Sequence, residues 1–292
     1  MSHIVTFVAN RQAGSLTAAE AKRAQDLAQG FEPTWLAEGW AMEFAVQNVP
    51  DRAALAAALD HKQVDIFVTK SRGRRKAVLV ADMDSTIVTC ETLDELAAFA
   101  GLKDEIAEIT RRAMNGELDF AAALRERVAM LTGLKLSALE ATWAEIQFCP
   151  GARELVATMR AHGATTALVS GGFTFFTSRV AAEIGFDIHR SNELLDNGSE
   201  LTGAVAEPIL DKNAKLHTLQ ELAQKRGVKL AATLAVGDGA NDLPMLKEAG
   251  LGIAYHAKPV VAAQVANRVE HTDLTSLLFA QGYPASAFKA GE

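Results

Sequence analysis

The stretch VLVADMDST, residues 78–86, joins a short apolar run to two carboxylates. Such a run is typical of a strand buried inside a parallel sheet. Asp82 and Asp84 follow it directly, with only Met83 between them. Because buried carboxylates are costly unless they are paired or bind a ligand, the end of this strand predicts a site of chemistry.

Similar apolar runs recur along the rest of the chain. They are TTALVSG at 165–171, ATLAVGD at 232–238 and LGIAY at 251–255. Helical patterns, such as those at 152–163 and 214–227, separate them. This alternation predicts a doubly wound, Rossmannoid α/β fold with a mostly parallel sheet.

Two segments interrupt that pattern. Residues 89–147 are mostly helical and too long for an ordinary connection between a strand and the next helix, so we expect a helical cap that covers a site as a lid. The Asn197–Gly198 pair predicts a hairpin that forms a small excursion beside the sheet.

The first 70 residues have a different organisation. Strands are predicted at 3–9, 33–36, 40–49 and 64–70, and helices at 17–29 and 51–61 with Thr17 and Asp51 as N-caps. This βαββαβ order is that of a ferredoxin-like domain. The predicted domains are therefore residues 1–70, residues 76–282 with the cap at about 89–147, and a C-terminal tail at 283–292.

Composition limits the possible functions. The 292-residue chain has a net charge of -7, which argues against a nucleic-acid or anionic-membrane surface. One basic run, SRGRRK at 71–76, is most simply a solvated linker. Two cysteines are too few for a disulfide scaffold. With no export signal and no apolar run of membrane-spanning length, we expect a soluble, cytoplasmic protein.

Polar residues follow three of the predicted strands. After Asp82 and Asp84 on the first, the run at 165–171 ends in Ser170 and Gly171, and the run at 232–238 leads into GDGAND at 237–242. Ligands of open α/β sheets bind at the carboxyl ends of the strands, where these groups converge. Clustered carboxylates repel one another unless a cation lies between them, and Mg²⁺ is the natural choice.

Mg²⁺ sites of this kind usually bind phosphate as well. The hydroxyl of Ser170 and the backbone around Gly171 suit phosphate oxygens, and Lys212 or Lys215 would balance the charge. Each feature alone is weak, since an isolated DxD, SGG or GDG is more often a turn and a lone lysine is typically solvated. Their order at successive strand ends makes the combination strong.

The same features carry a family resemblance. DMDST, SGG, a lysine and GDGANDLPML are similar to the haloacid dehalogenase superfamily of phosphotransferases, and the resemblance extends over about residues 76–275. Within that superfamily, DMDSTIVTCETLDELA, RRAMNGELDFAAALRERVAML and LVSGGF resemble the members that act on O-phospho-L-serine. The first 70 residues resemble the ACT-like regulatory extension of some bacterial members, in element order alone.

The resemblance implies how the phosphoryl group is handled. Asp82 would be the nucleophile that forms an aspartyl phosphate, and Asp84 the general acid and base. Mg²⁺ would be held by Asp82, the backbone carbonyl of Asp84 and Asp238, while Asp242 orients this metal site from outside. The groups implied to hold the phosphoryl group or its loop are Ser170, Gly171, Lys215 and Asn241.

The cap would select the substrate. By resemblance, Glu91 meets an amino group, Arg127 grips a carboxylate, and Met114 and Phe120 close over the substrate. Without the resemblance, Glu91 is more simply an acid at a helix start, and Arg127 an exposed helical residue.

The expected function is Mg²⁺-dependent hydrolysis of O-phospho-L-serine to L-serine and phosphate, the last step of serine biosynthesis. The alternatives are hydrolysis of another small phosphomonoester, phosphate transfer to an alcohol such as homoserine, and a non-catalytic amino-acid sensor. A regulatory role for L-serine and a homodimer formed through residues 1–70 are further possibilities that the sequence leaves open.

Overall fold

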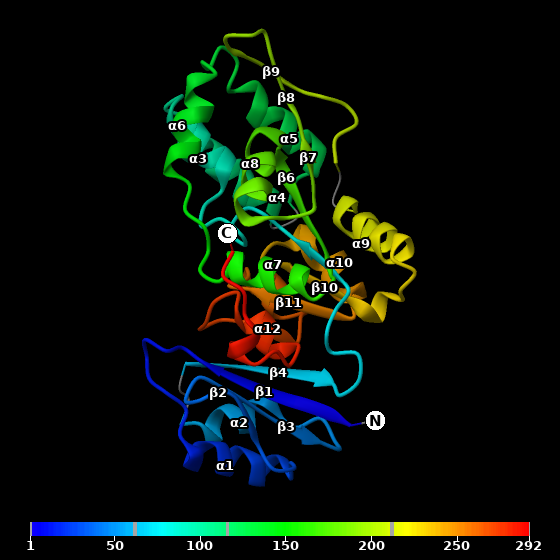
Figure 1. Ribbon diagram of the computed structural model, residues 1–292. Coiled ribbons are helices and arrows are strands. Elements are labelled where there is room, and N and C mark those ends of the chain that lie inside the picture. The colour runs from blue at the N-terminus through cyan, green and yellow to red at the C-terminus, as the bar shows by residue number, and fades with distance from the viewer. Residues whose placement is uncertain (1, 61–62, 115–116, 211–212, 292) are drawn as a thin grey trace.

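The computed structural model describes residues 2–60, 63–114, 117–210 and 213–291, with the side chain of Met114 outside the described part. A smaller N-terminal unit lies at one end of the molecule and a larger α/β unit at the other (Figure 1). Within the described ranges, no helix is long and apolar enough to span a membrane.

The N-terminal unit has the predicted βαββαβ order. Its elements are β1 (His3–Ala9), α1 (Ala18–Ala28), β2 (Thr34–Ala37), β3 (Ala41–Val46), α2 (Arg52–Ala58) and β4 (Val64–Lys70). The strands form an antiparallel sheet in the order β2-β3-β1-β4. Thr17 caps α1 in a capping box with Glu20, and the Asp51 side chain caps α2.

The α/β unit is built on a six-stranded parallel sheet in the order β12-β11-β10-β5-β6-β7. The strands are β5 (Val78–Ala81), β6 (Thr165–Phe173), β7 (Ile188–Asn192), β10 (Thr233–Gly237), β11 (Leu251–Tyr255) and β12 (Asn267–Val269). The predicted α/β fold is therefore confirmed. The two edge strands, β7 and β12, were not predicted.

Helices cover both faces of this sheet. The helices outside the cap are α7 (Ala152–Ala161), α8 (Thr174–Ile184), α9 (Ala214–Lys225), α10 (Leu243–Glu248), α11 (Pro259–Ala262) and α12 (Ser276–Ala280), with single 3-10 turns at Leu230–Ala232, Ala240–Asp242 and Ala285–Ala287. Leu79 of β5 packs in the core with α7 and α8, and Val80 in the core with α9 and α10. Burial from both sides explains the unbroken apolar run before Asp82.

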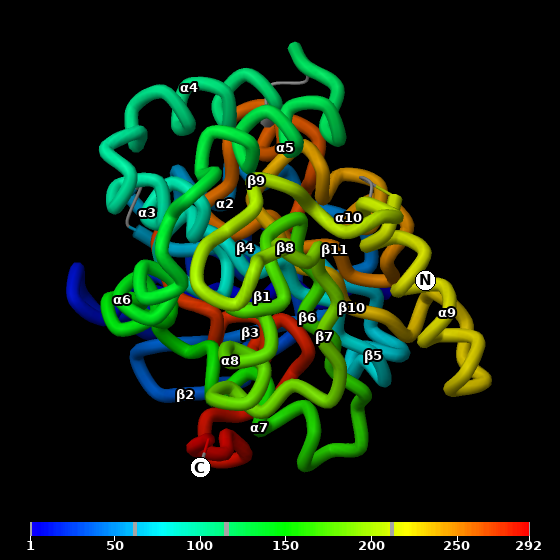
Figure 2. The backbone as a smooth tube through the Cα atoms, turned by 90° about the horizontal axis from the view of Figure 1, so that it is seen from above, coloured from blue at the N-terminus to red at the C-terminus, as the bar shows by residue number. Residues whose placement is uncertain are grey.

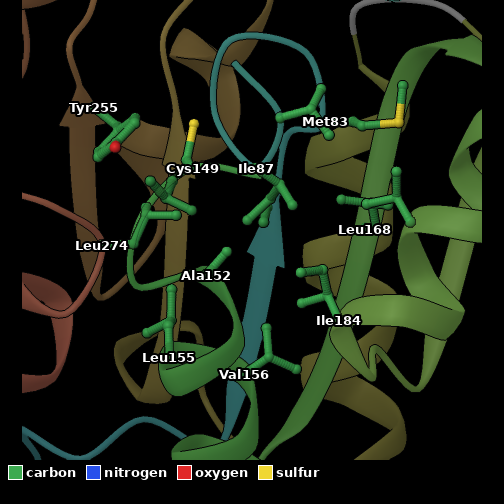
Figure 3. Close-up of a cluster of buried hydrophobic side chains, with 14 of the residues drawn as sticks. Met83, Ile87, Cys149, Ala152, Leu155, Val156, Leu168, Ile184, Tyr255 and Leu274 are labelled. Atoms are coloured by element: carbon green, nitrogen blue, oxygen red, sulfur yellow. The ribbon is translucent and has the colours of Figure 1, made fainter. Parts of the chain in front are cut away.

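The core on the α7 and α8 side extends up to the active-site edge of the sheet. Figure 3 shows Leu155 and Val156 of α7 and Ile184 of α8 around β5, with Met83 and Ile87 above its end. Met83 and Ile87 have no exposed surface. The loop that carries the two aspartates is thus anchored by two buried apolar side chains, one between the acidic positions and one after them.

The cap consists of α3 (Thr92–Ala98), α4 (Lys103–Met114), α5 (Phe120–Ala129) and α6 (Ser137–Glu145). The predicted hairpin is present as β8 (Leu194–Asp196) and β9 (Leu201–Val205). Instead of lying beside the large sheet, it packs on α5 and pairs with the cap, where Gly133 N–H donates to the Leu201 carbonyl oxygen (2.9 Å) (Figure 2). The cap is therefore formed by two separate chain segments.

Two short stems attach the cap to the α/β unit. In the first, Val88 and Phe148 form an isolated antiparallel bridge as the chain leaves for the helices and returns. In the second, at the base of the hairpin, Ala206 N–H donates to the Glu193 carbonyl oxygen at 2.9 Å. In both stems the outgoing and returning chains are hydrogen-bonded together.

The two units share a core. The free face of the N-terminal sheet contributes Val8 and Phe67 to the same buried cluster as Phe279 of α12. The rings of Trp40 and Phe279 meet edge to face, with centroids 4.8 Å apart. The start of the predicted tail also joins, since Tyr283 is buried.

Asp65 of β4 forms the main polar contact between the units. Its buried carboxylate accepts hydrogen bonds from the backbone N–H groups of Glu270 (2.9 Å), His271 (3.2 Å) and Thr272 (3.0 Å). Three backbone donors of the α/β unit thus share the carboxylate of one buried side chain of the N-terminal unit.

Asp65→Asn should lower the free energy of unfolding by about 1–3 kcal/mol, because the amide group places a donor against backbone donors and leaves at least one unpaired. The matched control is Asp60→Asn, which changes an exposed carboxylate paired with Arg23 and should cost less than about 0.5 kcal/mol. Urea unfolding of both variants measures the difference. Equal effects would contradict the interpretation of Asp65 as the link between the units.

Candidate active site

Two adjacent strands bring the predicted acidic residues together. Asp82 follows β5, and Asp238 and Asp242 follow the neighbouring β10. A carboxylate oxygen from each of the three lies within 4.8 Å of the others, and all three side chains are buried. The predicted convergence at the carboxyl edge of the sheet is thus present.

Lys215, the second residue of α9, holds two of these carboxylates. Its buried Nζ lies 2.6 Å from Asp82 Oδ2 and 2.6 Å from Asp242 Oδ1. Burial by itself lowers the pKa of this amine, but Asp242 and Asp82 raise the pKa above its ordinary value, so Lys215 stays charged. The other lysine considered, Lys212, lies outside the described residues.

Asp242 organises the loop that follows β10. Its Oδ2 accepts the backbone N–H of Asp238 (3.1 Å) and of Gly239 (2.9 Å). A Cβ at Gly237 would lie 2.3 Å from Asp242 Cγ, so this position has room only for glycine. Because Asp242 holds both Lys215 and the backbone of this loop, its geometry suits an orienting side chain.

The remaining carboxylates fit a divalent cation. Asp238 Oδ2 is buried and lies 3.2 Å from Lys258 Nζ, but it accepts no hydrogen bond from the described residues. Burial first, and then Asp242, raise the pKa of Asp82 well above its usual range. Crowded acids of this kind are stabilised as anions by a hard cation, so the donor set fits Mg²⁺ bound through Asp82 and Asp238.

Asp84 lies between the cap and the sheet. Its Oδ1 accepts the backbone N–H of Thr92, the first residue of α3, at 2.8 Å, and its Oδ2 accepts the Ser170 hydroxyl at 2.9 Å. Ser170 Oγ in turn accepts the Gly172 N–H at 2.8 Å. The carboxyl group is therefore held in one orientation at the mouth of the acidic cluster.

Glu91 is placed beside Asp84 by a backbone reversal. Ser85 has a φ of 54°, in the left-handed region, and its hydroxyl donates to Glu91 Oε1 at 2.8 Å. Burial, followed by the nearby Asp84, raises the pKa of Glu91 to about 8. Glu91 also precedes α3 as its N-cap residue, although its side chain forms no capping hydrogen bond.

Arg127 reaches the same pocket from α5 of the cap. Only 8% of the residue is exposed, so the alternative of a solvated helical arginine does not hold. Its Nη1 donates to Thr110 Oγ1 (2.9 Å) and its Nε to the Ala123 carbonyl oxygen (3.2 Å). The Thr110 hydroxyl donates to Asp94 (3.0 Å). Within the described part of the chain, Arg127 forms no ion pair.

The cap is closed on the sheet. Phe120, at the start of α5, lies over Gly171, where an added Cβ would be 2.9 Å from the Phe120 ring. Asn241 lines the same pocket from the loop after β10. Met114 ends α4, but its side chain lies outside the described part, so its predicted contact with substrate stays a prediction.

Sequence reasoning missed two residues of the site. Lys258 pairs with Asp238, and Asn192, at the end of β7, donates from Nδ2 to the Gly171 carbonyl oxygen at 2.8 Å. Asn192 Oδ1 also accepts the Leu210 N–H at 2.8 Å, which ties the loop before α9 to the end of β6. Neither residue belongs to a motif with an evident chemical meaning.

Together these residues enclose a small pocket. It measures about 90 Å³ and is lined by Asp82, Asp84, Asp238, Glu91, Arg127, Phe120, Ser170, Gly171 and Asn241, among others. The sheet edge supplies Asp82, Asp84, Asp238 and the Ser170 hydroxyl, while the cap supplies Arg127, Glu91 and the apolar cover. Such a pocket can bind a small molecule with a charged group at each end.

Comparison with known proteins agrees with this geometry. The model of the haloacid dehalogenase-like hydrolase family matches residues 79–247. The phosphoserine phosphatase of Streptococcus thermophilus is 47% identical over 203 residues, which cover 70% of this chain and 94% of that protein. The phosphoserine phosphatase of Streptomyces coelicolor is 41% identical over 257 residues, covering 86% of this chain and 63% of the relative, so the chain spans less than two thirds of that longer protein.

Two solved structures are similar in fold. The haloacid dehalogenase family hydrolase t0658 from Salmonella enterica serovar Typhi has a TM-score of 0.83 at 30% identity, covering 96% of this chain and 98% of its own. A phospho-aspartyl intermediate analogue of phosphoserine phosphatase has a TM-score of 0.67 at 38% identity, covering 70% of this chain and 98% of its own.

Gly237→Ala should lower kcat by about 100-fold while the protein stays folded, because the added methyl displaces the Asp242 carboxylate that orders Asp238 and Lys215. Steady-state kinetics and a thermal melt followed by circular dichroism measure the two effects. Asp242→Asn keeps the shape of the side chain but places an amide donor against Lys215 or against the backbone N–H groups, so it should lower kcat as well. A Gly237→Ala enzyme with nearly normal kcat would contradict the orienting role of Asp242.

Proposed function

The chain belongs to the haloacid dehalogenase-like hydrolase family, among the phosphoserine phosphatases, and from this premise we propose that it hydrolyses O-phospho-L-serine with Asp82 as nucleophile. One observation supports the choice of substrate most directly. A buried guanidinium without an ion-pair partner among the described residues, that of Arg127, lines the same pocket as the acidic cluster. Burying such a charge is costly unless an anion binds beside it.

The charges of the pocket match a phosphorylated amino acid. The substrate carboxylate would bind Arg127, and its ammonium group would bind Glu91, which a nearby cation keeps ionised despite the raised pKa. Its phosphoryl group would lie against Ser170 and Lys215 at the sheet edge. A sugar phosphate has no carboxylate for Arg127 and would leave this charge uncompensated.

In the first chemical step, a carboxylate oxygen of Asp82 attacks phosphorus, the new P–O bond forms, and the bond from phosphorus to the serine oxygen breaks. Asp84 donates its proton to the departing serine oxygen. The hydroxyl of Ser170 and the ammonium of Lys215 stabilise the charge on the transferring group. The products of this step are L-serine and an aspartyl phosphate.

In the second step, Asp84, now ionised, accepts a proton from water as the water oxygen attacks phosphorus. The bond between phosphorus and Asp82 breaks and phosphate is released. The Thr92 N–H holds the Asp84 carboxyl group in place, so one carboxyl group serves both directions of proton transfer. The closed cap limits water access to the intermediate.

Mg²⁺ bound by Asp82, Asp238 and the Asp84 carbonyl oxygen would neutralise the phosphoryl oxygens and the acidic cluster. Asp238 Oδ2 supports this assignment, because it is buried beside Lys258 and accepts no hydrogen bond from the described residues. Regulation by L-serine, a homodimer formed by the N-terminal unit, the cytoplasmic location and the domain boundaries stay predictions.

Asp82→Asn should abolish turnover and leave the fold intact, because an amide is not a nucleophile here. With the wild-type enzyme, acid quenching during turnover of labelled O-phospho-L-serine should trap the label on Asp82, as peptide mapping would show. Label on a serine or a histidine would refute the mechanism. Asp82→Asn should show no trapped label.

Arg127→Ala should reduce kcat/KM for O-phospho-L-serine by about 30- to 1,000-fold, equivalent to about 2–4 kcal/mol, because a charge-assisted contact to the carboxylate is lost. An aryl phosphate, which has no carboxylate, should lose far less. The measurement is the ratio of kcat/KM for the two substrates in each enzyme.

The matched control is Arg125→Ala, two residues away on the same helix. Arg125 is exposed and pairs with Glu207 on the surface, so its removal should leave both substrates within about twofold of the wild-type values. If Arg127→Ala lowers both substrates equally, Arg127 has a structural or phosphate-binding role and the assignment of the amino-acid end is wrong.

A further inference from the structure

The cleft between the N-terminal unit and the α/β unit is a second cavity, far from the chemistry. Its walls on the α/β side come from the starts of parallel strands, including Ala232 before β10 and Leu251 of β11. The active site lies at the opposite, carboxyl edge of the same sheet. The cleft measures about 540 Å³, within the range of cavities that bind small ligands.

The cleft is strongly basic. Seven lysine and arginine side chains line it: Arg52 from α2, five residues between 70 and 76, and Lys229 from the loop before β10. No aspartate or glutamate is among the described residues of its lining. The chain as a whole carries a net charge of -7, so this is a local concentration of positive charge. The run SRGRRK is therefore more than a solvated linker.

Most of these cations have no anionic partner. Within the described ranges, Arg74 is the one lining cation that pairs with a carboxylate, that of Glu43 at 2.5 Å. Lys76 Nζ donates to two carbonyl oxygens, those of Gly73 (2.9 Å) and Ala231 (2.8 Å), and Arg52 donates to Asn267 Oδ1 (2.8 Å). These acceptors are neutral, so the charges remain uncompensated.

The outer cations have no hydrogen-bond or ion-pair partner in the part of the chain that the structure describes. Lys70, Arg72 and Lys229 are exposed, and their side chains form no hydrogen bond or ion pair with the described residues. Three side chains can therefore reach a ligand without giving up an existing contact. They come from both units, since Lys70 ends β4 and Lys229 precedes β10.

Unsatisfied polar atoms line the same cavity. The buried atoms His3 Nδ1, Thr69 Oγ1 and Arg74 Nε have no hydrogen-bond partner among the described residues, and all three residues line the cleft. Thr69 is only 8% exposed. Buried groups of this kind are normally hydrogen-bonded, so the arrangement is complete only with a further partner.

The cations also affect one another. Burial, followed by the nearby charge of Lys70, lowers the pKa of Lys76 to about 8. Burial, followed by the nearby charge of Arg268, lowers the pKa of Arg52 to about 10. Like charges held together destabilise the folded chain unless an anion binds among them. A loss of folding stability of this kind is typical of a binding site.

We propose that this cleft binds a small ligand with two or more phosphate groups, such as a nucleoside diphosphate or triphosphate, between the two units. Seven cations exceed what a single phosphate needs. Val49, Val68 and Leu251 give the cleft an apolar wall for the uncharged part of the ligand. A small ligand is favoured over nucleic acid because the cations line one cavity rather than an extended surface. The proposal does not depend on the phosphatase activity.

Calorimetric titration of the full chain, without added metal ion, tests the site. The probes are adenylyl imidodiphosphate, tripolyphosphate and orthophosphate. We expect the nucleotide analogue to bind at least as tightly as tripolyphosphate, and orthophosphate to bind at least about tenfold more weakly. The variant Lys70→Gln/Arg72→Gln/Lys229→Gln should weaken binding of the first two probes by at least about tenfold.

The control variant Lys22→Gln/Lys135→Gln/Lys289→Gln removes the same charge from exposed positions elsewhere and should leave binding within about twofold. Thermal melts establish that both variants are folded. Three results would each overturn the proposal: no binding to the wild-type chain, equal effects of the two triple variants, or tighter binding of an oligoribonucleotide than of the nucleotide analogue.

Discussion

The mutual repulsion of buried carboxylates is the constraint on which this structure depends. Asp82, Asp238 and Asp242 lie close together with almost no access to water, and such groups would protonate or separate if nothing compensated them. Lys215 bridges two of them, and Lys258 contacts the third. Helix α9 must therefore begin at a fixed place, so that its second residue, Lys215, points toward the end of β5. The fold around the acidic edge is arranged to keep that charge balance.

Much of the catalytic half could be predicted from sequence, for a physical reason. The inner strands are buried on both faces, so they read as unbroken apolar runs, and three of them, β5, β6 and β10, lead directly into functional residues. Local motifs such as DMDST and GDGAND thus indicate both where a strand ends and which functional side chains follow it. The N-caps Thr17 and Asp51 were predictable for the same reason, because a capping residue acts on its own helix.

What could not be predicted depends on contacts between distant segments. The edge strands β7 and β12 are short and partly polar, since only one neighbour pairs with each, and so they lack an apolar signature. The hairpin joins the cap because β9 packs on α5, and no local sequence pattern indicates this contact. The burial of Arg127 arises from the packing of helices α4 and α5, and its own sequence, LRERVAM, resembles a solvated helix. The shared core between the units likewise arises from surfaces far apart in the chain.

The two stems of the cap determine how the pocket exchanges its contents. The cap is attached by two stems, near Val88 and near Glu193. A rigid-body rotation of the cap would therefore take place about the line that joins these stems. Phe120 and Arg127 are carried on the same helix, so they move as one piece. A movement that withdraws Arg127 from the pocket would therefore also withdraw Phe120 from Gly171, where the phosphoryl group is proposed to bind. For the proposed hydrolysis of O-phospho-L-serine, one displacement of the cap would therefore open the site both to the departing serine and to the incoming water.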